Sequence, residues 1–237
     1  MLKNKTLKAV DLGFIGYNEA LTVQENYHAE IVAYKRKNRT LHIKEQTSTR
    51  NYLLFCQHPP VYTIGKSGSK ANLLVTETAL QRQSVPLYEV NRGGDITYHG
   101  PGQLVVYPIV DLENFYTDIH WYLRLLEEAV VELLENFSIQ ATTIPGLTGV
   151  WVRSASGTSD LDRKICAIGI RVRNWVTMHG LALNVTNDLT PFGQIVPCGL
   201  KKPVTSMQQE IQQEIQQSIN IQMVQACLQT ILSKKFV

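Results

Sequence analysis

The sequence lacks the patterns that mark several classes of protein. Its 237 residues include four cysteines, Cys56, Cys166, Cys198 and Cys227, and no two of them form a C-x-x-C pair. This spacing argues against a disulfide framework and against a zinc site. No apolar run approaches the roughly 18–20 residues that a membrane span needs, and no apolar signal core follows the basic start. We therefore expect a cytoplasmic protein without a membrane segment.

Charge and composition are those of an ordinary globular protein. The formal net charge of +3 is too small to argue for a nucleic-acid-binding protein. The hydrophobic share of 44% and the charged share of 18% are typical of soluble domains. There is no repeat of 20–50 residues and no clear linker. A single domain over residues 1–237 is expected.

The hydrophobic pattern alternates between strands and helices. Apolar residues at helical spacing predict one helix from Tyr17 to about Lys37 and a second from about Ile119 to Asn136, which Asp118 can cap. The tail from about 206 to 235 also has helical spacing, and a short helix is expected within 71–83. Strands are expected at 8–13, 41–43, 51–57, 61–65, 85–90, 96–98, 104–112, 148–152, 164–172 and 177–185. This order favours an α+β fold, a mixed sheet flanked by helices, with the helices of about 206–237 appended to it.

The segment from Arg92 to Pro108 is the most unusual in the chain. It contains a Gly93-Gly94 pair, a short extended piece, a Gly-Pro-Gly turn and an apolar run. Glycines allow a backbone to approach a ligand closely, because no Cβ stands in the way. Arg92, Asp95 and His99 are crowded into a piece that would be apolar if it were only a strand. The segment predicts either a polar β-hairpin or one wall of a binding site.

A nucleophilic cysteine is the main chemical hypothesis that the residues themselves offer. Cys198 lies between proline and glycine, outside any apolar run, and a nearby cation would increase its thiolate fraction. Lys164 starts a strand directly after a turn, and His99 and His179 each precede a glycine. All three are candidates for the cation that would favour the Cys198 thiolate. The alternative is that Cys198 is an inert loop residue, Lys164 a solvated one and the histidines turn residues.

Several blocks, in order along nearly the whole chain, resemble the lipoyl(octanoyl) transferases. The resemblance is carried by Leu12-Gly13 with Tyr17, Ala20 and Gln24; 58–65, HPPVYTIG; 92–105, RGGDITYHGPGQLV; 149–152, GVWV; 164–169, KICAIG; 179–185, HGLALNV; and 195–199, IVPCG. These enzymes move an octanoyl group from acyl carrier protein to a lysine of lipoate-dependent proteins. Their fold is similar to that of biotin protein ligases and lipoate ligases, and the resemblance implies the same fold here.

The resemblance also implies roles for residues. Cys198 matches the nucleophile that carries the acyl group as a thioester, and Lys164 matches the residue that lowers the pKa of that thiol and transfers protons. The matched substrate-binding residues are Arg92, Gly93, Gly94, Asp95, Ile96, Thr97, Tyr98, His99, Ala167, Ile168, Gly169, Gly180, Leu181 and Ala182. No cofactor and no metal is implied.

The implied partners are octanoyl-acyl carrier protein as donor and lipoyl-domain proteins as acceptors, namely E2 subunits of 2-oxoacid dehydrogenases and the glycine cleavage H protein. Because acyl carrier proteins are acidic, basic residues are candidate docking contacts: Lys35, Arg36, Lys37, Lys66, Lys70, Lys201 and Lys202.

Three alternatives stay open. The enzyme could be a relay that moves octanoyl groups between lipoyl-domain proteins, or an ATP-dependent lipoate or biotin ligase. It could also be a non-catalytic module that binds the carrier. ATP dependence, the identity of the donor and the effect of replacing Cys198 distinguish them.

Overall fold

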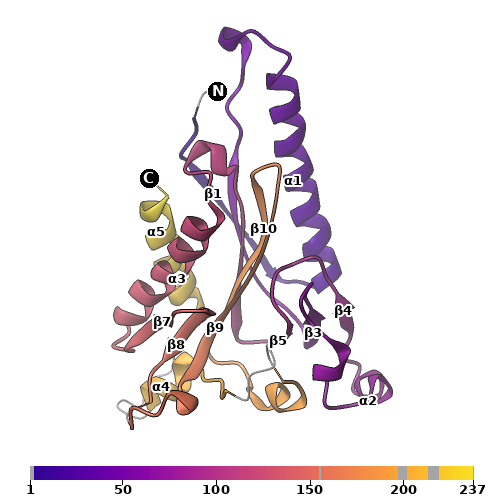
Figure 1. Ribbon diagram of the computed structural model, residues 1–237, viewed down its shortest axis with the longest axis vertical. Coiled ribbons are helices and arrows are strands. Elements are labelled where there is room, and N and C mark those ends of the chain that lie inside the picture. The colour runs from indigo at the N-terminus through magenta and orange to yellow at the C-terminus, as the bar shows by residue number, and fades with distance from the viewer. Residues whose placement is uncertain (1–2, 155, 197–201, 213–218, 237) are drawn as a thin grey trace.

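The fold is built on a mixed seven-stranded sheet with the order β1-β2-β6-β10-β9-β8-β7 (Figure 1). The computed structural model describes residues 3–154, 156–196, 202–212 and 219–236. β1 is parallel to β2, and the remaining neighbours are antiparallel. The strands of this sheet are β1 Leu7–Phe14, β2 Asn51–Gln57, β6 Gln103–Ile109, β7 Ala141–Ile144, β8 Leu147–Val152, β9 Arg163–Arg173 and β10 Val176–Asn184. The mixed sheet that the sequence predicts is confirmed.

A smaller sheet contains β4 (Leu87–Glu89), β3 (Val61–Ile64) and β5 (Ile96–His99), in that order. β5 and β6 flank the Gly-Pro-Gly turn but lie in different sheets, so the prediction of a hairpin is wrong. The turn instead carries the chain from the small sheet to the large one. Gly102 has a φ of +85°, and a Cβ there would lie 2.8 Å from the backbone nitrogen of Asn187, so this position requires glycine.

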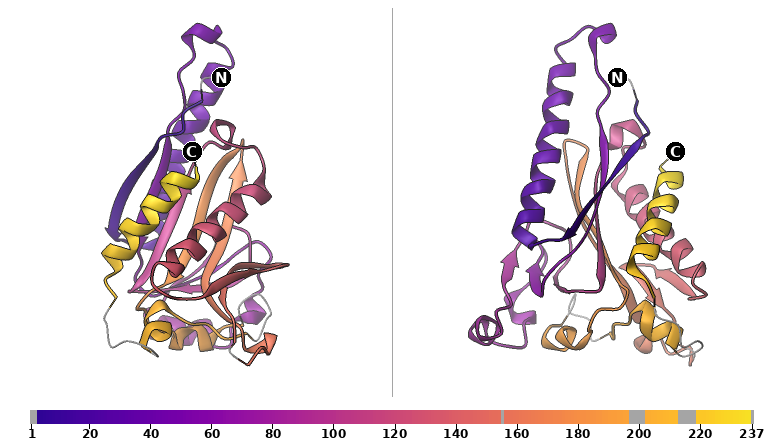
Figure 2. Two further views of the ribbon diagram at one scale, coloured as in Figure 1. Left: turned by 90° about the vertical axis from the view of Figure 1, so that its left-hand side faces the viewer. Right: turned by 180° about the vertical axis from the view of Figure 1, so that it is seen from behind.

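Helices cover both faces of the large sheet (Figure 2). α1 (Tyr17–Asn38) packs on one face, and α3 (Ile119–Glu135) and α5 (Ile221–Lys235) pack together on the other. α3 begins where predicted, because the Asp118 carboxylate accepts hydrogen bonds from the first-turn N–H groups of His120 and Trp121. None of the described helices is long and apolar enough to cross a membrane. The short helices are α2 Glu77–Arg82 and α4 Met207–Gln212, and the 3₁₀ turns are η1 Ile43–Glu45, η2 Lys70–Asn72, η3 Leu112–Asn114, η4 Ser159–Leu161 and η5 Thr190–Gln194.

Some elements differ from the prediction. Residues 41–43 form no strand, because the chain turns there and enters η1, and β6 ends at Ile109 rather than continuing to 112. β7 is not predicted, because its four residues carry no apolar alternation. The tail contains two described helices, α4 and α5. Residues 213–218 between them lie outside the described residues, and 219–220 are not helical. Met207, Leu228 and Leu232 are buried in the same hydrophobic cluster as α3.

Lys35 is a structural residue and not a docking contact. It is 2% exposed, and its Nζ lies 2.5 Å from Asp111 Oδ1 and 3.2 Å from Glu113 Oε2. The same amine donates a hydrogen bond to the carbonyl of Asn174, so it ties α1 to η3 and to the β9–β10 turn. The prediction that Lys35 contacts a partner is therefore wrong. Arg36 and Lys37 belong to the last turn of α1, and this end of the helix points away from the small sheet (Figure 1).

Replacing Lys35 with methionine should lower the free energy of unfolding by about 3–5 kcal/mol, because it leaves the buried carboxylate of Asp111 without its cation. Denaturant unfolding followed by circular dichroism measures the change. Arg36→Met is the matched control, since Arg36 is exposed on the same turn, and its expected change is about 0.5 kcal/mol or less. Equal losses in the two variants would mean that Asp111 does not depend on Lys35.

Candidate active site

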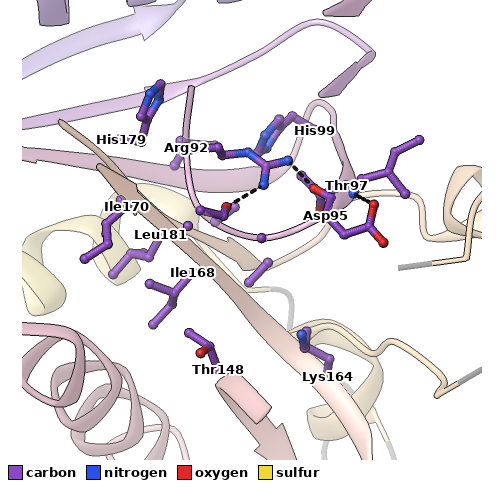
Figure 3. A pocket seen from close by; sticks show the side chains of 18 of the residues that line it. Arg92, Asp95, Thr97, His99, Thr148, Lys164, Ile168, Ile170, His179 and Leu181 are labelled. Atoms are coloured by element: carbon purple, nitrogen blue, oxygen red, sulfur yellow. Dashed lines mark hydrogen bonds between the residues drawn. The ribbon is translucent and has the colours of Figure 1, made fainter. Parts of the chain in front are cut away.

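A cavity of about 440 Å³ lies where the small sheet, β9 and β10 meet (Figure 3). Lys164 and all but one of the substrate-site residues implied by the resemblance line it: Arg92, Gly93, Gly94, Asp95, Ile96, Thr97, His99, Ala167, Ile168, Gly169, Gly180, Leu181 and Ala182. The exception is Tyr98, which points away from its neighbours on β5 and packs on Tyr62 and Phe192. Cys198 lies outside the described residues.

The cavity follows the part of β9 that extends beyond β8. At its start β9 pairs with β8, with Trp151 opposite Lys164 and Val150 opposite Cys166, and a register shift between these two pairs marks a bulge. Farther along, the N–H of Gly93 donates to the carbonyl of Ile170 at 2.8 Å. The stretch 167–169 therefore runs along the cavity between β8 and the loop 92–94.

Close backbone contacts fix the glycines of this wall. A Cβ on Gly169 would lie 2.7 Å from the carbonyl oxygen of Gly93, and a Cβ on Gly180 would lie 2.1 Å from the carbonyl oxygen of Val106. Both contacts are shorter than a carbon can accept from backbone, so only glycine fits. These two glycines face each other across β9 and β10. The absence of a side chain at these two positions lets the loop 92–94 and strand β6 pack closely against β9 and β10.

Arg92 and Asp95 build the loop that forms the upper wall. The guanidinium of Arg92 donates to the carbonyl and hydroxyl oxygens of Thr63 and to the carbonyl of Asp95, each at 2.8 Å. The Asp95 carboxylate accepts hydrogen bonds from the backbone N–H groups of Ser69 and Ile96. Both side chains are 8% exposed. Their bonds hold the loop in the shape that the cavity requires.

His99 presents an acceptor nitrogen. The Gln103 amide nitrogen donates to the Tyr98 carbonyl and to Asn184 Oδ1, so its oxygen is left to accept from His99 Nδ1 at 2.8 Å. His99 therefore carries its proton on Nδ1, and its Nε2 is an acceptor. Burial, reinforced by His58, lowers the pKa of His99 to about 3. His99 is neutral at physiological pH.

His179 lies at the other end of the cavity from Lys164 (Figure 3). It is 2% exposed, has a φ of +57°, and its Nδ1 has no hydrogen-bond partner among the described residues. Burial, reinforced by Arg92 and Arg171, lowers the pKa of His179 to about 4. Like His99, it is a neutral group at physiological pH and cannot supply the positive charge of the site.

Lys164 supplies an amine at the end of the cavity that contains the bulge. Its Nζ lies 4.6 Å from the ring centroid of Trp151. Its backbone N–H donates to the carbonyl of Pro203, and its carbonyl accepts from the N–H of Thr205, both at 2.9 Å. The residues that follow 197–201 in sequence are thus bound beside Lys164. On the other side of that stretch, the N–H of Val196 donates to the carbonyl of Asn72.

The cavity is also lined by residues to which the sequence analysis assigned no role in the site, among them Tyr17, Gln103, Tyr107 and Asn184. Tyr17, Gln103 and Asn184 stand inside the blocks that carry the resemblance, so their motif was a signal that could have identified them. Tyr107 had no such signal, because it is one aromatic residue within an apolar strand.

The arrangement suits an acyl chain. Most of the cavity lining is apolar, with glycine backbone and aliphatic side chains on its walls, and the Lys164 amine lies at one end. A concave, mostly apolar site with a limited set of placed polar groups is the usual form of a small-molecule pocket. Among the described residues, no group of three or more His, Cys, Asp or Glu side chains is placed to hold a metal ion.

Comparison with known proteins agrees with this geometry. The model of the lipoyl protein ligase A/B catalytic domain matches residues 18–232. An octanoyltransferase of Cytophaga hutchinsonii is 52% identical over 209 residues, 88% of this chain and 85% of the relative. An octanoyltransferase of Christiangramia forsetii is 51% identical over 225 residues, 94% of this chain and 92% of the relative.

Among solved structures, a lipoate protein ligase from an archaeal lipoylation system of Thermoplasma acidophilum superposes with a TM-score of 0.65 at 17% identity. The match covers 96% of this chain and 82% of that one. This likeness confirms the expected fold. With the family match and the close relatives, it follows that the chain belongs to the lipoyl protein ligase A/B catalytic domain family and is one of its octanoyltransferases, acyltransferases that act in protein lipoylation.

Proposed function

We propose that the enzyme takes the octanoyl group from acyl carrier protein, holds it as a thioester on Cys198, and passes it to a lysine of a lipoyl-domain protein. The observation that carries the proposal is the cavity itself, a mostly apolar space with the Lys164 amine at one end. Both stretches that flank 197–201 are bound within or near this site, and Cys198 is close in sequence to each. E2 subunits of 2-oxoacid dehydrogenases and the glycine cleavage H protein are the proposed acceptors.

The fourteen residues implied by the resemblance are the proposed substrate site, and thirteen of them line the cavity. Burying an eight-carbon chain at roughly 0.8 kcal/mol per methylene contributes about 5 kcal/mol of binding. Gly169 and Gly180 shape the space for that chain indirectly, because the absence of a Cβ lets the backbone of Gly93 and of Val106 approach β9 and β10. Tyr98 would act indirectly, through its packing under β5.

In the first half-reaction, Cys198 gives its proton to neutral Lys164, and the thiolate attacks the carrier thioester. The bond from the acyl carbon to the carrier sulfur breaks, and the leaving thiolate takes the proton from Lys164. In the second half-reaction, the neutral acceptor lysine attacks the Cys198 thioester. The C–N bond forms, the C–S bond breaks, and Lys164 accepts the proton that the amine loses. The thiolate–ammonium pair is then restored, and no cofactor is consumed.

We also infer that residues 1–237 form one catalytic domain to which the helices of about 206–237 belong. Met207 of α4 and Leu228 of α5 are buried in the main hydrophobic cluster, which supports this interpretation.

The proposed route is tested by mixing the wild-type enzyme with octanoyl-loaded acyl carrier protein in the absence of ATP and weighing the intact enzyme by mass spectrometry. The expected result is a mass increase of one octanoyl group that hydroxylamine removes, since thioesters are cleaved by it. Transfer to a lipoyl domain that needs ATP would favour a ligase instead. An adduct that forms only from an octanoylated lipoyl-domain protein would favour the relay.

A further inference from the structure

A buried carboxylate lies behind β8, outside the cavity. Glu127 is on the buried face of α3 and is 0% exposed. Its Oε1 accepts a hydrogen bond from the backbone N–H of Gly149 at 2.8 Å. Its Oε2 lies 2.7 Å from the guanidinium of Arg124, an ionic contact that lacks the alignment of a hydrogen bond. Carboxylates are rarely fully buried, so the burial of Glu127 calls for a structural or functional reason.

Gly149 connects this carboxylate to Lys164. Gly149 has a φ of +116°, and a Cβ built on it would lie 2.6 Å from the carbonyl oxygen of Cys166 and 3.5 Å from Lys164 Cε. The side chain of Lys164 therefore lies directly over the glycine whose N–H Glu127 holds. The position is next to the bulge between β8 and β9, and a bulge is a common way to redirect a side chain into a site. Glu127, Gly149 and Lys164 form one stack from the core to the cavity.

We propose that Glu127 is a positioning residue for Lys164: it fixes the backbone against which the lysine side chain lies, and its negative charge favours the protonated amine. Glu127 does not line the cavity, so it touches no substrate. The consequence for the reaction rests on the role proposed for Lys164, which must hold a proton while Cys198 is a thiolate. A fixed negative charge behind the amine makes that proton easier to hold.

The charges around the pair support the coupling. Burial raises the pKa of Glu127, whereas the Gly149 N–H, Arg124 and Lys164 act in the opposite direction. Interaction between two sites is reciprocal, so a lysine that favours the carboxylate is favoured by it to the same degree. Other titratable groups also face Glu127 and Lys164. Glu128 lies on α3, and Cys166 and the Arg163–Glu210 ion pair lie at the start of β9. Across the cavity are Arg92, Asp95, His99 and His179.

The test uses Glu127→Gln, because the amide oxygen can still accept from Gly149 while the charge is removed. The enzyme is labelled with [¹³Cε]lysine, the Lys164 signal is assigned from its absence in Lys164→Arg, and the signal is titrated by NMR. The pKa of Lys164 is expected to fall by about one unit in Glu127→Gln. Glu128→Gln is the matched control, since it removes the same charge from the next, exposed position, and about 0.2 units or less is expected there. Thermal unfolding confirms that both variants are folded.

Equal titration of Lys164 in the two variants would overturn the inference. The pH profile of transfer from the octanoyl-enzyme gives the second measurement, and its acidic limb is expected to move to lower pH by the same amount in Glu127→Gln. The NMR titration needs no acyl donor. A shifted Lys164 titration in an enzyme whose transfer rate does not depend on Lys164 would therefore support the positioning of Lys164 and contradict only its proposed role in the reaction.

Discussion

Replacing Cys198 with alanine is expected to abolish the octanoyl adduct and to lower the rate of octanoyl transfer about 10³-fold or more. The reason is that the alanine enzyme has no thiolate to attack the donor, and removing a nucleophile typically costs at least this factor. Intact mass spectrometry of the enzyme after mixing with octanoyl-acyl carrier protein measures the adduct. A gel-shift or mass assay of the lipoyl domain measures the transfer.

The control is Cys227→Ala, which removes a half-buried thiol of α5 that does not line the cavity. It should form the adduct as the wild type does. Cys56 and Cys166 are poor candidates for the same chemistry, because burial raises the pKa of each thiol. An adduct that persists in Cys198→Ala would remove this residue from the mechanism.

Replacing Lys164 with alanine is expected to slow octanoyl transfer about 10²–10⁴-fold, the usual contribution of a positioned acid–base group. The pH optimum for acylation should move upward, because the thiolate of Cys198 loses the nearby cation that favours it. Single-turnover kinetics at several pH values measure both effects. An unchanged pH profile would remove Lys164 from the mechanism. Lys44→Ala is the control, since it removes an exposed lysine of η1 that neither lines the cavity nor belongs to the candidate docking contacts.

Lys164→Arg separates the two halves of the reaction. Arginine keeps a positive charge for the thiolate but does not release its proton, since its pKa is above about 12. The acyl-enzyme should still form, with water instead of Lys164 protonating the carrier thiolate that leaves, while transfer to the lipoyl domain should fail, because arginine cannot accept the proton of the acceptor lysine. His99 and His179, with pKa values lowered to about 3 and about 4, do not change charge between pH 5 and 9, so neither histidine accounts for a limb of the pH profile in that range.

The sequence predicts the long, strongly patterned elements of this fold well. α1 and α3 start and end within a residue or two of the predicted limits, because each has a clear apolar stripe, and Asp118 caps α3. The pairing of the strands, in contrast, could not be predicted from the sequence. Neither the hydrophobic pattern nor the Gly-Pro-Gly turn tells whether β5 and β6 pair with each other. Strand pairing depends on contacts between distant parts of the chain, here β3 with β5 and β10 with β6.

The site could be predicted in part. The blocks that resemble the transferase family predicted thirteen substrate-site residues that do line the cavity, and they also predicted Lys164. They included Tyr98 with its neighbours, although strand alternation turns its side chain into the core. They missed Glu127, which is one acidic residue in an amphipathic helix and has no sequence signal. Its importance is visible only when α3 is packed under Gly149.

The loop that walls the cavity also covers part of an open strand edge. β9 is longer than β8, and a strand edge without a neighbour is a template on which another chain can pair and aggregate. The hydrogen bond from Gly93 to Ile170 occupies part of that edge with the protein's own backbone. Substitutions that loosen the loop, such as those at Arg92, are therefore expected to expose this edge and to promote aggregation.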